Sequence, residues 1–310
     1  MSERLDGQSV LLVGPGWLGA PTAQALTSFG ARVWTLRRSV SMTTSVRETD
    51  HESAPPPIAL AGDIRQSGAD SHWRRALPAT LDAIVVCLAP SRSAGDSHET
   101  TYPASLSAAM QLATECGCRA IVYTSSTGVY GRTDGGISRE SDVMVAGDAK
   151  QRALLAAEAS LREPAQHTNV TRTILRVAGL YGPARDPAPR FAAWAPDQSP
   201  DVWCNFSWRD DVVSAIVRRV SDPSTTGEAH VFNCADGTPM RTSDIARALG
   251  ASDDAPLTRT IAPVLPGRSN QQIHVEPLLS TGWRPSMPSV LHGLRALGHV
   301  VHGGDSGVTR

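Results

Sequence analysis

Lysine is almost absent from this sequence: Lys150 is the only one among 29 lysine and arginine residues. Excess charge of either sign is missing as well, because the formal net charge is -1 and the pI is about 6.8. Proteins that bind nucleic acids or anionic membrane surfaces carry an excess of basic residues. We therefore expect neither a nucleic-acid partner nor a membrane partner.

Long apolar runs and paired cysteines are also missing. No run of 18 apolar residues occurs, and the N-terminal stretch MSERLDGQ is too polar for a signal peptide. The five cysteines are an odd number without a Cys-x-x-Cys pair, which is typical of a reduced, cytoplasmic protein. Cys116 and Cys118 could form a redox or metal pair. The interpretation as two small residues near a helix end is favoured, and we expect no metal site.

The 310 residues are enough for about two domains. Apolar strand-like segments alternate with helical patterns up to residue 177, which is typical of a parallel sheet covered on both faces. The strands are expected at 9–13, 32–36, 58–61, 81–88, 120–124 and 171–177, and the helices at 20–29, 100–116 and 150–161. We predict an α/β fold with a Rossmann-type, doubly wound domain over 1–177. Residues 178–310 would form a smaller, mixed α/β substrate region, with some segments returning to the Rossmann core.

A glycine-rich turn follows the first expected strand and opens the first helix. Gly14, Gly16 and Gly19 form the pattern G-x-G-x-x-G, with Trp17 and Leu18 inside it. In this context the first glycine permits a tight turn, the second lets the backbone approach a pyrophosphate, and the third allows close helix packing. The helix N-terminus attracts the anion. The pattern therefore predicts a dinucleotide site.

The second expected strand ends in two arginines, Arg37 and Arg38, and no acidic residue follows them. An acidic residue at this position holds the ribose diol of NAD, whereas an arginine accommodates the 2′-phosphate of NADP. Guanidinium groups match phosphate geometry. The pair favours NADP over NAD, although a solvated basic pair would look the same.

Two segments after later strands carry a resemblance. These are YTSSTGVYG at 123–131 and LRVAGLYGP at 175–183, joined by Gly62-Asp63-Ile64, by NFSWRDDV at 205–212 and by the ending at 282–294. Together they resemble the extended short-chain dehydrogenase/reductases, which include nucleotide-sugar epimerases and dehydratases. The ending resembles an atypical bacterial branch of epimerase-like NAD(P)-binding proteins. The resemblance spans about residues 9–297.

The resemblance implies a small-molecule substrate and a homodimer formed through the helices at 100–116 and 150–161. It also implies further cofactor contacts, at Asp63, Ile64, Leu88, Ala89, Ala178, Gly179 and Leu180, besides Lys150.

Members of this family use a Ser/Thr and a Tyr-x-x-x-Lys pair, in which the tyrosine is the general acid/base and the lysine holds the cofactor ribose. Ser126 matches the Ser/Thr position, but no tyrosine here is followed four residues later by lysine. If Lys150 is the family lysine, Ala146 fills the tyrosine position. If Glu158 matches the acid that follows the family lysine, Lys150 itself fills the tyrosine position. Both alignments put Lys150 at the active site, and an exposed residue at a helix start is the alternative.

The proton donor is therefore open among Lys150, Ser126 relaying a proton from water, Tyr130 and His98. Tyr130 belongs to a turn that more often packs, and His98 lies on the segment after the fourth strand. Four further residues are candidate substrate contacts: Thr127, Arg185, Arg190 and Trp208. Trp208 stands where relatives carry a histidine, which indicates a more apolar substrate wall.

Three functional hypotheses follow. The first is an NADP(H)-dependent oxidoreductase that moves a hydride to or from a carbonyl or imine carbon. The second is a nucleotide-sugar epimerase or dehydratase with retained NAD. The third, motivated by the missing tyrosine, is a dinucleotide-binding regulator or scaffold without turnover.

Overall fold

The structure is a computed structural model that describes residues 4–38, 55–89, 96–144, 146–163, 169–194, 200–222, 227–251 and 269–302. The chain forms two compact units. Unit 1 comprises Met1–Val129, Ala146–Arg176 and Val212–Phe232, and unit 2 comprises Tyr130–Val145, Val177–Asp211 and Asn233–Arg310. The division of the chain after residue 177 stays a prediction.

A seven-stranded sheet forms the centre of unit 1, in the order β11-β7-β5-β4-β1-β2-β3. Its strands are β1 (Ser9–Val13), β2 (Arg32–Arg37), β3 (Ile58–Ala61), β4 (Ala83–Val86), β5 (Ala120–Ser126), β7 (Thr171–Val177) and β11 (Ala229–Cys234). β1 pairs in parallel with β2 and β4, with Val10 opposite Val33 and Ala83. This strand order is that of a doubly wound Rossmann fold. The predicted fold class is confirmed.

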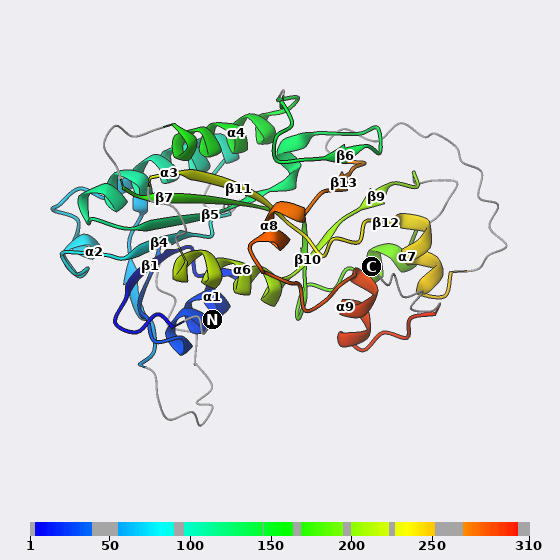
Figure 1. Ribbon diagram of the computed structural model, residues 1–310, viewed down its shortest axis with the longest axis horizontal. Helices are drawn as coiled ribbons and strands as arrows, with labels where there is room; N and C mark the ends of the chain where they lie inside the picture. Colours follow the sequence, from blue (N-terminus) through cyan, green and yellow to red (C-terminus); the bar gives the residue numbers. More distant parts are fainter. Residues whose placement is uncertain are drawn as a thin grey trace. The chain divides into compact units, whose positions relative to one another are not determined.

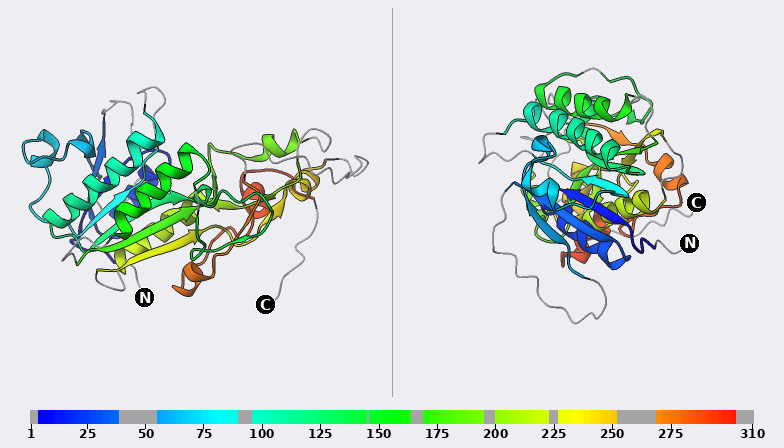
Figure 2. Two further views of the ribbon diagram at one scale, coloured as in Figure 1. Left: turned by 90° about the horizontal axis from the view of Figure 1, so that it is seen from above. Right: turned by 90° about the vertical axis from the view of Figure 1, so that its left-hand side faces the viewer.

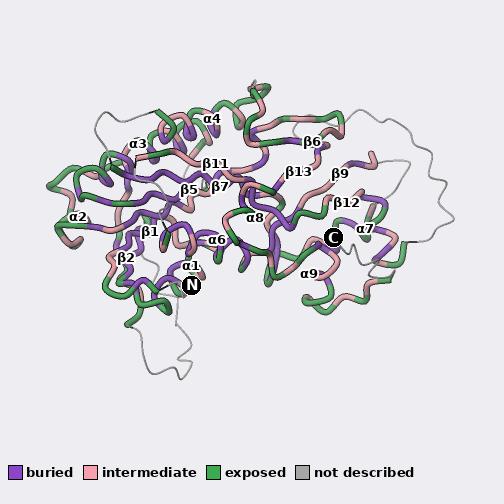
Figure 3. Tube along the Cα trace, viewed as in Figure 1, coloured by how far each residue is buried: buried purple, intermediate pink, exposed green. Residues whose placement is uncertain are grey.

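The central strands form because their residues are apolar on both faces. Residues 10–13 of β1, all of β4 and all of β7 are buried, as the purple tube in Figure 3 shows. A parallel strand covered by helices on both sides has no polar face, which explains these continuous apolar runs. β7 is the exception, because its buried residues include Arg172 and Arg176.

Helices cover both faces of this sheet. α3 (His98–Glu115) and α4 (Ala149–Arg162) lie above it in Figure 1, and α1 (Gly19–Ser28) and α6 (Arg209–Ser221) lie below it. α3 and α4 run side by side in both views of Figure 2. The shorter elements η1 (Ile64–Gln66), α2 (His72–Arg75) and η3 (Thr127–Tyr130) connect the strands.

Side-chain caps determine where α3 and α4 begin. In α3 the Ser97 hydroxyl accepts a hydrogen bond from the Thr100 N–H, and in α4 the Asp148 carboxylate accepts one from the Gln151 N–H. Such caps satisfy N–H groups that have no partner inside the helix. α3 therefore starts two residues before the predicted position. His98, expected on the segment after the fourth strand, is its first residue.

Unit 2 consists of short elements around a small aromatic core. The elements are β6 (Ile137–Ser138), β8 (Gly179–Tyr181), α5 (Ala188–Ala192), β9 (Trp203–Cys204), β10 (Phe206–Trp208), β12 (Met240–Arg241), α7 (Thr242–Ala248), β13 (Gln272–Ile273), α8 (Glu276–Ser280) and α9 (Val290–Ala296). Tyr181 packs edge-on against Phe206 and Trp208, with ring centroids 5.6 and 5.2 Å apart. These rings join Phe191 and Ile245 in one buried cluster.

Candidate dinucleotide site

The three glycines of the turn between β1 and α1 have different surroundings. Gly14 has φ +88°, and a Cβ there would lie 2.5 Å from the carbonyl oxygen of Cys87. A Cβ on Gly19 would lie 2.2 Å from the carbonyl oxygen of Gly14. A Cβ on Gly16 would meet no atom within 4 Å. Gly14 and Gly19 are therefore required by the fold itself, whereas Gly16 borders open space that a ligand can enter.

The N-terminus of α1 is suited to an anion. The N-cap is Leu18, no side chain caps the helix, and its first turn contains no acidic residue. N–H groups at a helix N-terminus carry partial positive charge and bind phosphate well. The open space beside Gly16 lies in the same turn. These two features fit a dinucleotide pyrophosphate.

A pocket lies at the carboxyl ends of β1, β2 and β3 in unit 1. It is lined by Val13, Leu36, Arg37, Arg38, Gly62, Asp63, Ile64, Arg65, Leu88, Ala89, Thr101 and Ser105. The set brings together six residues predicted to bind cofactor: Arg37, Arg38, Asp63, Ile64, Leu88 and Ala89. Ligands of open α/β sheets bind at this edge of the sheet.

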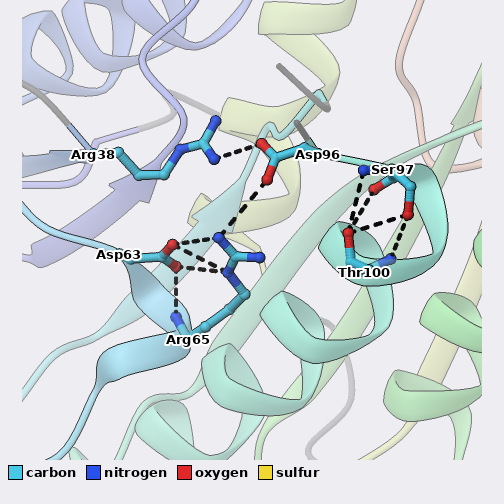
Figure 4. A network of polar contacts seen from close by, with 6 residues as sticks. All are labelled: Arg38, Asp63, Arg65, Asp96, Ser97 and Thr100. Carbon is cyan, nitrogen blue, oxygen red and sulfur yellow. Dashed lines mark hydrogen bonds and ion pairs between the residues drawn. The ribbon is translucent and has the colours of Figure 1, made fainter. Parts of the chain in front are cut away.

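Three charged groups that line the pocket, Arg38, Asp63 and Arg65, form a network with Asp96, drawn in Figure 4. Arg38 Nη1 lies 2.5 Å from Asp96 Oδ2, and Arg65 Nη2 lies 2.5 Å from Asp63 Oδ2 and 3.9 Å from Asp96 Oδ1. Hydrogen bonds from the Arg65 guanidinium hold the pKa of the Asp63 carboxyl below its usual range. Asp63 is therefore a carboxylate at neutral pH. Arg37 is exposed at the pocket edge.

Sequence reasoning missed Arg65 and Asp96. Arg65 was detectable, because it stands two residues after Asp63 and its side chain returns to that carboxylate. Asp96 had no such signal, because it stands two residues before α3 and meets Arg38 only through the folded chain.

Ser126 and Lys150 approach each other around Gly128. Ser126 is the last residue of β5, and its Oγ accepts a 3.1 Å hydrogen bond from the Gly128 N–H. A Cβ on Gly128 would lie 3.2 Å from Ser126 Oγ and 3.9 Å from Lys150 Nζ. Both polar groups therefore face the space that the glycine leaves. Lys150 is the second residue of α4 and is exposed.

Ser125, the neighbour of Ser126, belongs to a buried ionic network with Glu158 and Arg176. Arg176 of β7 donates to Glu158 of α4, with Nη2 2.6 Å from Oε2, and the Ser125 hydroxyl donates to Glu158 Oε1 at 2.7 Å. The network ties α4 to β5 and β7. It thereby connects the helix that carries Lys150 to the strand that ends in Ser126.

Two other candidate proton donors make contacts within their own units. The Tyr130 hydroxyl donates a 2.7 Å hydrogen bond to Oδ1 of Asn233, which is buried. The His98 ring lies 5.6 Å from the Tyr102 ring. These contacts support packing roles for both rings.

Most of the predicted substrate contacts lie in unit 2. Trp208 is buried in the aromatic core, Arg190 lies 5.4 Å above the Phe191 ring, and Arg185 is exposed. Thr127 is buried and belongs to unit 1. Ala178, Gly179 and Leu180, predicted to contact the cofactor, also belong to unit 2, where Gly179 opens β8.

The cysteine pair has the surroundings of packed side chains. Cys116 and Cys118 are both buried, and burial raises the pKa of Cys118 to about 12. Among the described residues, no group of three or more His, Cys, Asp or Glu side chains is arranged to hold a metal ion. In that same part of the chain, no helix is long and apolar enough to cross a membrane.

A family model and a curated relative match this chain. The family model described as the NAD dependent epimerase/dehydratase family matches residues 10–235. Protein YeeZ of Escherichia coli strain K12 is 32% identical over 260 residues, which cover 78% of this chain and 84% of YeeZ.

Solved structures show the same fold. A protein from Methylobacillus flagellatus, provisionally named an NAD-dependent epimerase/dehydratase, superposes with a TM-score of 0.70 at 24% identity, covering 94% of this chain and 97% of its own. The dTDP-glucose 4,6-dehydratase DesIV of Streptomyces venezuelae, solved with NAD and TYD bound, gives a TM-score of 0.70 at 19% identity. That match covers 93% of this chain and 95% of DesIV.

Proposed function

This chain belongs to the NAD-dependent epimerase/dehydratase family, and on that premise we propose that it is an NADP(H)-dependent oxidoreductase. It would move a hydride between the nicotinamide and a carbonyl or imine carbon of a small molecule. The observation that carries the proposal is the pocket at the ends of β1, β2 and β3, which is lined by Arg37, Arg38 and Arg65.

The charge of this pocket supports NADP over NAD. Arg37 ends β2 and Arg38 follows it, at the position where an acidic residue would hold the ribose diol of NAD. Guanidinium groups bind phosphate through charge-assisted hydrogen bonds. Three arginines and one carboxylate, Asp63, line the pocket, and Asp96 pairs with Arg38 beside it. A 2′-phosphate would therefore meet a net positive charge.

The glycine turn would hold the pyrophosphate. The open space beside Gly16 and the uncapped N-terminus of α1 supply room and partial positive charge. Bound NADP(H) would supply or accept the hydride. The remaining chemistry, orientation of the substrate and movement of a proton, belongs to the side chains.

Ser126 and Lys150 are the residues that we assign to that chemistry. A hydroxyl has one proton and two acceptor positions, so Ser126 can accept from Gly128 and still donate to the reacting oxygen or nitrogen. The Lys150 ammonium has three protons to donate, and its positive charge would favour an alkoxide over an alcohol. The proton would come from Lys150 directly or from a water beside Ser126.

A side-by-side titration with NADPH and NADH tests the cofactor assignment. Trp17, half-buried inside the glycine turn, is a fluorescence probe close to the site. We expect NADPH to bind at least about tenfold more tightly, which corresponds to about 1.4 kcal/mol. Equal or tighter binding of NADH would overturn the NADP assignment.

Turnover needs a separate test. NADPH oxidation is followed with a panel of aldehydes, ketones and imines, with a Ser126→Ala variant as the control. Hydride transfer to a panel member, lost in the variant, is the expected result. A protein that binds NADPH but oxidises it with no panel member would contradict the oxidoreductase proposal and favour the regulator or scaffold.

A second candidate function has its own support. Solved structures with the same fold include nucleotide-sugar enzymes such as DesIV, which favours an epimerase or dehydratase with retained NAD. Such an enzyme would purify with NAD bound. The missing Tyr-x-x-x-Lys pair and the two arginines at the end of β2 count against this candidate.

Assembly is proposed from the resemblance, and location from the odd, scattered cysteines. We propose a homodimer through the neighbouring helices α3 and α4, and a cytoplasmic location. Sedimentation equilibrium measures the first, and fractionation of cells measures the second.

A further inference from the structure

The carboxylate of Asp96 lies between two arginines of the candidate cofactor pocket. Its Oδ2 is 2.5 Å from Arg38 Nη1, and its Oδ1 is 3.9 Å from Arg65 Nη2. The Asp96 side chain is only 8% exposed, against 40% for Arg38 and 30% for Arg65. The Asp96 carboxylate is thus paired with Arg38, the arginine that a phosphate ligand would bind.

The two arginines differ in how strongly they are held. Arg65 makes several hydrogen bonds to Asp63, through both Nε and Nη2, and so it is anchored on its own side of the pocket. Arg38 has its ion pair with Asp96. Arg38 is also the more exposed guanidinium. It is therefore the arginine on which a ligand and Asp96 would compete.

We propose that Asp96 is a specificity-determining residue that competes with the 2′-phosphate of the cofactor for Arg38. The proposal rests on the proposed function, in that the adenosine ribose of a dinucleotide must lie at the end of β2. A phosphate that pairs with Arg38 either displaces the Asp96 carboxylate or stays beside it. Displacement breaks a short ion pair, and coexistence brings two anions together.

NAD(H) lacks the 2′-phosphate and so does not compete with Asp96 for Arg38. A ribose hydroxyl is uncharged and leaves the Arg38–Asp96 ion pair in place. Asp96 therefore lowers the affinity for NADPH and leaves the affinity for NADH unchanged or higher. An acidic residue that favours NAD is absent after β2 in the sequence, and Asp96 supplies one from the start of α3.

The test is the ratio of the NADH to the NADPH dissociation constant in wild type and in Asp96→Asn, measured by calorimetry at fixed ionic strength. The variant keeps the shape of the side chain and removes its charge. We expect the ratio to rise about threefold to tenfold, which corresponds to about 0.7 to 1.4 kcal/mol, since half-exposed ion pairs have modest energies.

Two controls separate this effect from a general change in charge or structure. Glu99→Gln removes a carboxylate from the first turn of the same helix, where Glu99 pairs with Arg152 at 3.6 Å, and should leave the ratio unchanged. In an Arg38→Ala background, the Asp96→Asn change should no longer raise the ratio.

Binding of adenosine 2′,5′-bisphosphate, compared with binding of AMP, repeats the measurement without the nicotinamide half of the cofactor. A Ser variant of Asp96, checked by thermal unfolding, replaces the Asn variant if that protein fails to fold.

An unchanged ratio, or weaker NADPH binding in Asp96→Asn, overturns the proposal, because Asp96 then only positions Arg38. This failure is distinguishable from failure of the proposed function. If wild type prefers NADH and the variant gains NADPH affinity, the NADP assignment fails and the role of Asp96 stands. If neither protein binds either dinucleotide, both are overturned.

Discussion

Arg176 and Glu158 form an ion pair that is removed from solvent: Nη2 lies 2.6 Å from Oε2, and the two side chains are 0% and 1% exposed. Ser125 completes the arrangement with a hydrogen bond to Glu158 Oε1. A buried ion pair is strongly coupled to the fold, because removal of one partner leaves an uncompensated charge without water. The pair therefore attaches α4 to the sheet through electrostatics as well as packing.

Breaking this pair should destabilise unit 1. We expect Glu158→Gln to lower the free energy of unfolding by about 3–5 kcal/mol, because the Arg176 charge loses its partner. Urea denaturation followed by circular dichroism measures it. Replacement of both residues by apolar ones, Glu158→Leu with Arg176→Met, should cost much less. A single variant as stable as wild type would contradict the assigned role.

The glycine turn should separate binding from stability. Gly16→Ala should leave the melting temperature unchanged, because a Cβ there meets no atom within 4 Å, and should weaken dinucleotide binding by filling the space beside the turn. Gly19→Ala should instead destabilise the protein, since its Cβ would lie 2.2 Å from a carbonyl oxygen. Thermal unfolding and cofactor titration of both variants provide the comparison. Intact affinity in Gly16→Ala would exclude this turn as the pyrophosphate site.

Lys150 should matter for turnover and not for folding. Lys150→Met should lower kcat by about 10²–10⁴-fold if the ammonium donates the proton. Its stability should match wild type, because Lys150 is exposed. Lys150→Arg keeps the charge, so partial recovery of KM but not of kcat would indicate proton transfer. Recovery of both would indicate a ribose contact only.

Asp236 should make the stability of unit 2 depend on pH. Burial, with the charge of Asp211 added, raises the pKa of the Asp236 carboxyl well above its usual value. Between the unfolded and the raised folded pKa the folded state binds the additional proton, so the free energy of unfolding falls as pH rises across that window. Asp236→Asn should therefore be more stable than wild type at pH 7. The fall in the free energy of unfolding with rising pH that Asp236 causes should disappear in this variant.

Urea denaturation at pH 5 and pH 8 measures the effect. The exposed Asp244 supplies the control, because Asp244→Asn should change the free energy of unfolding by less than about 0.5 kcal/mol at either pH. An Asp236→Asn protein with the wild-type pH slope would contradict the assignment.

Local patterns predicted the parts of the fold that depend on local sequence. β1 and β7 have the predicted bounds, and the glycine turn lies between β1 and α1 as expected. Apolar runs identify strands buried on both faces, since such strands have no solvent-facing side that would select polar residues. The start of α3 was wrong by two residues, because the Ser97 cap was overlooked.

The site was less predictable for a physical reason. Arg38 and Asp96 meet only because β2 ends beside the start of α3, and no spacing rule connects them. Trp208 illustrates a different difficulty: a family position indicated a substrate wall, and the side chain packs against Tyr181 in the core of unit 2. Sequence patterns identify elements and turns, whereas the partners of charged side chains depend on tertiary structure.

The exposure of Lys150 has a practical consequence. Because no other lysine occurs, the chain has a single ε-amine, on the first turn of α4 and close to Ser126. An amine-reactive dye or crosslinker can therefore modify a lysine side chain of this protein only at Lys150. Because the α-amine of the chain also reacts with such reagents, a peptide map would separate that product from conjugation at Lys150. Protection of that amine by a bound molecule would report occupancy of the surrounding space in a single mass-spectrometric measurement.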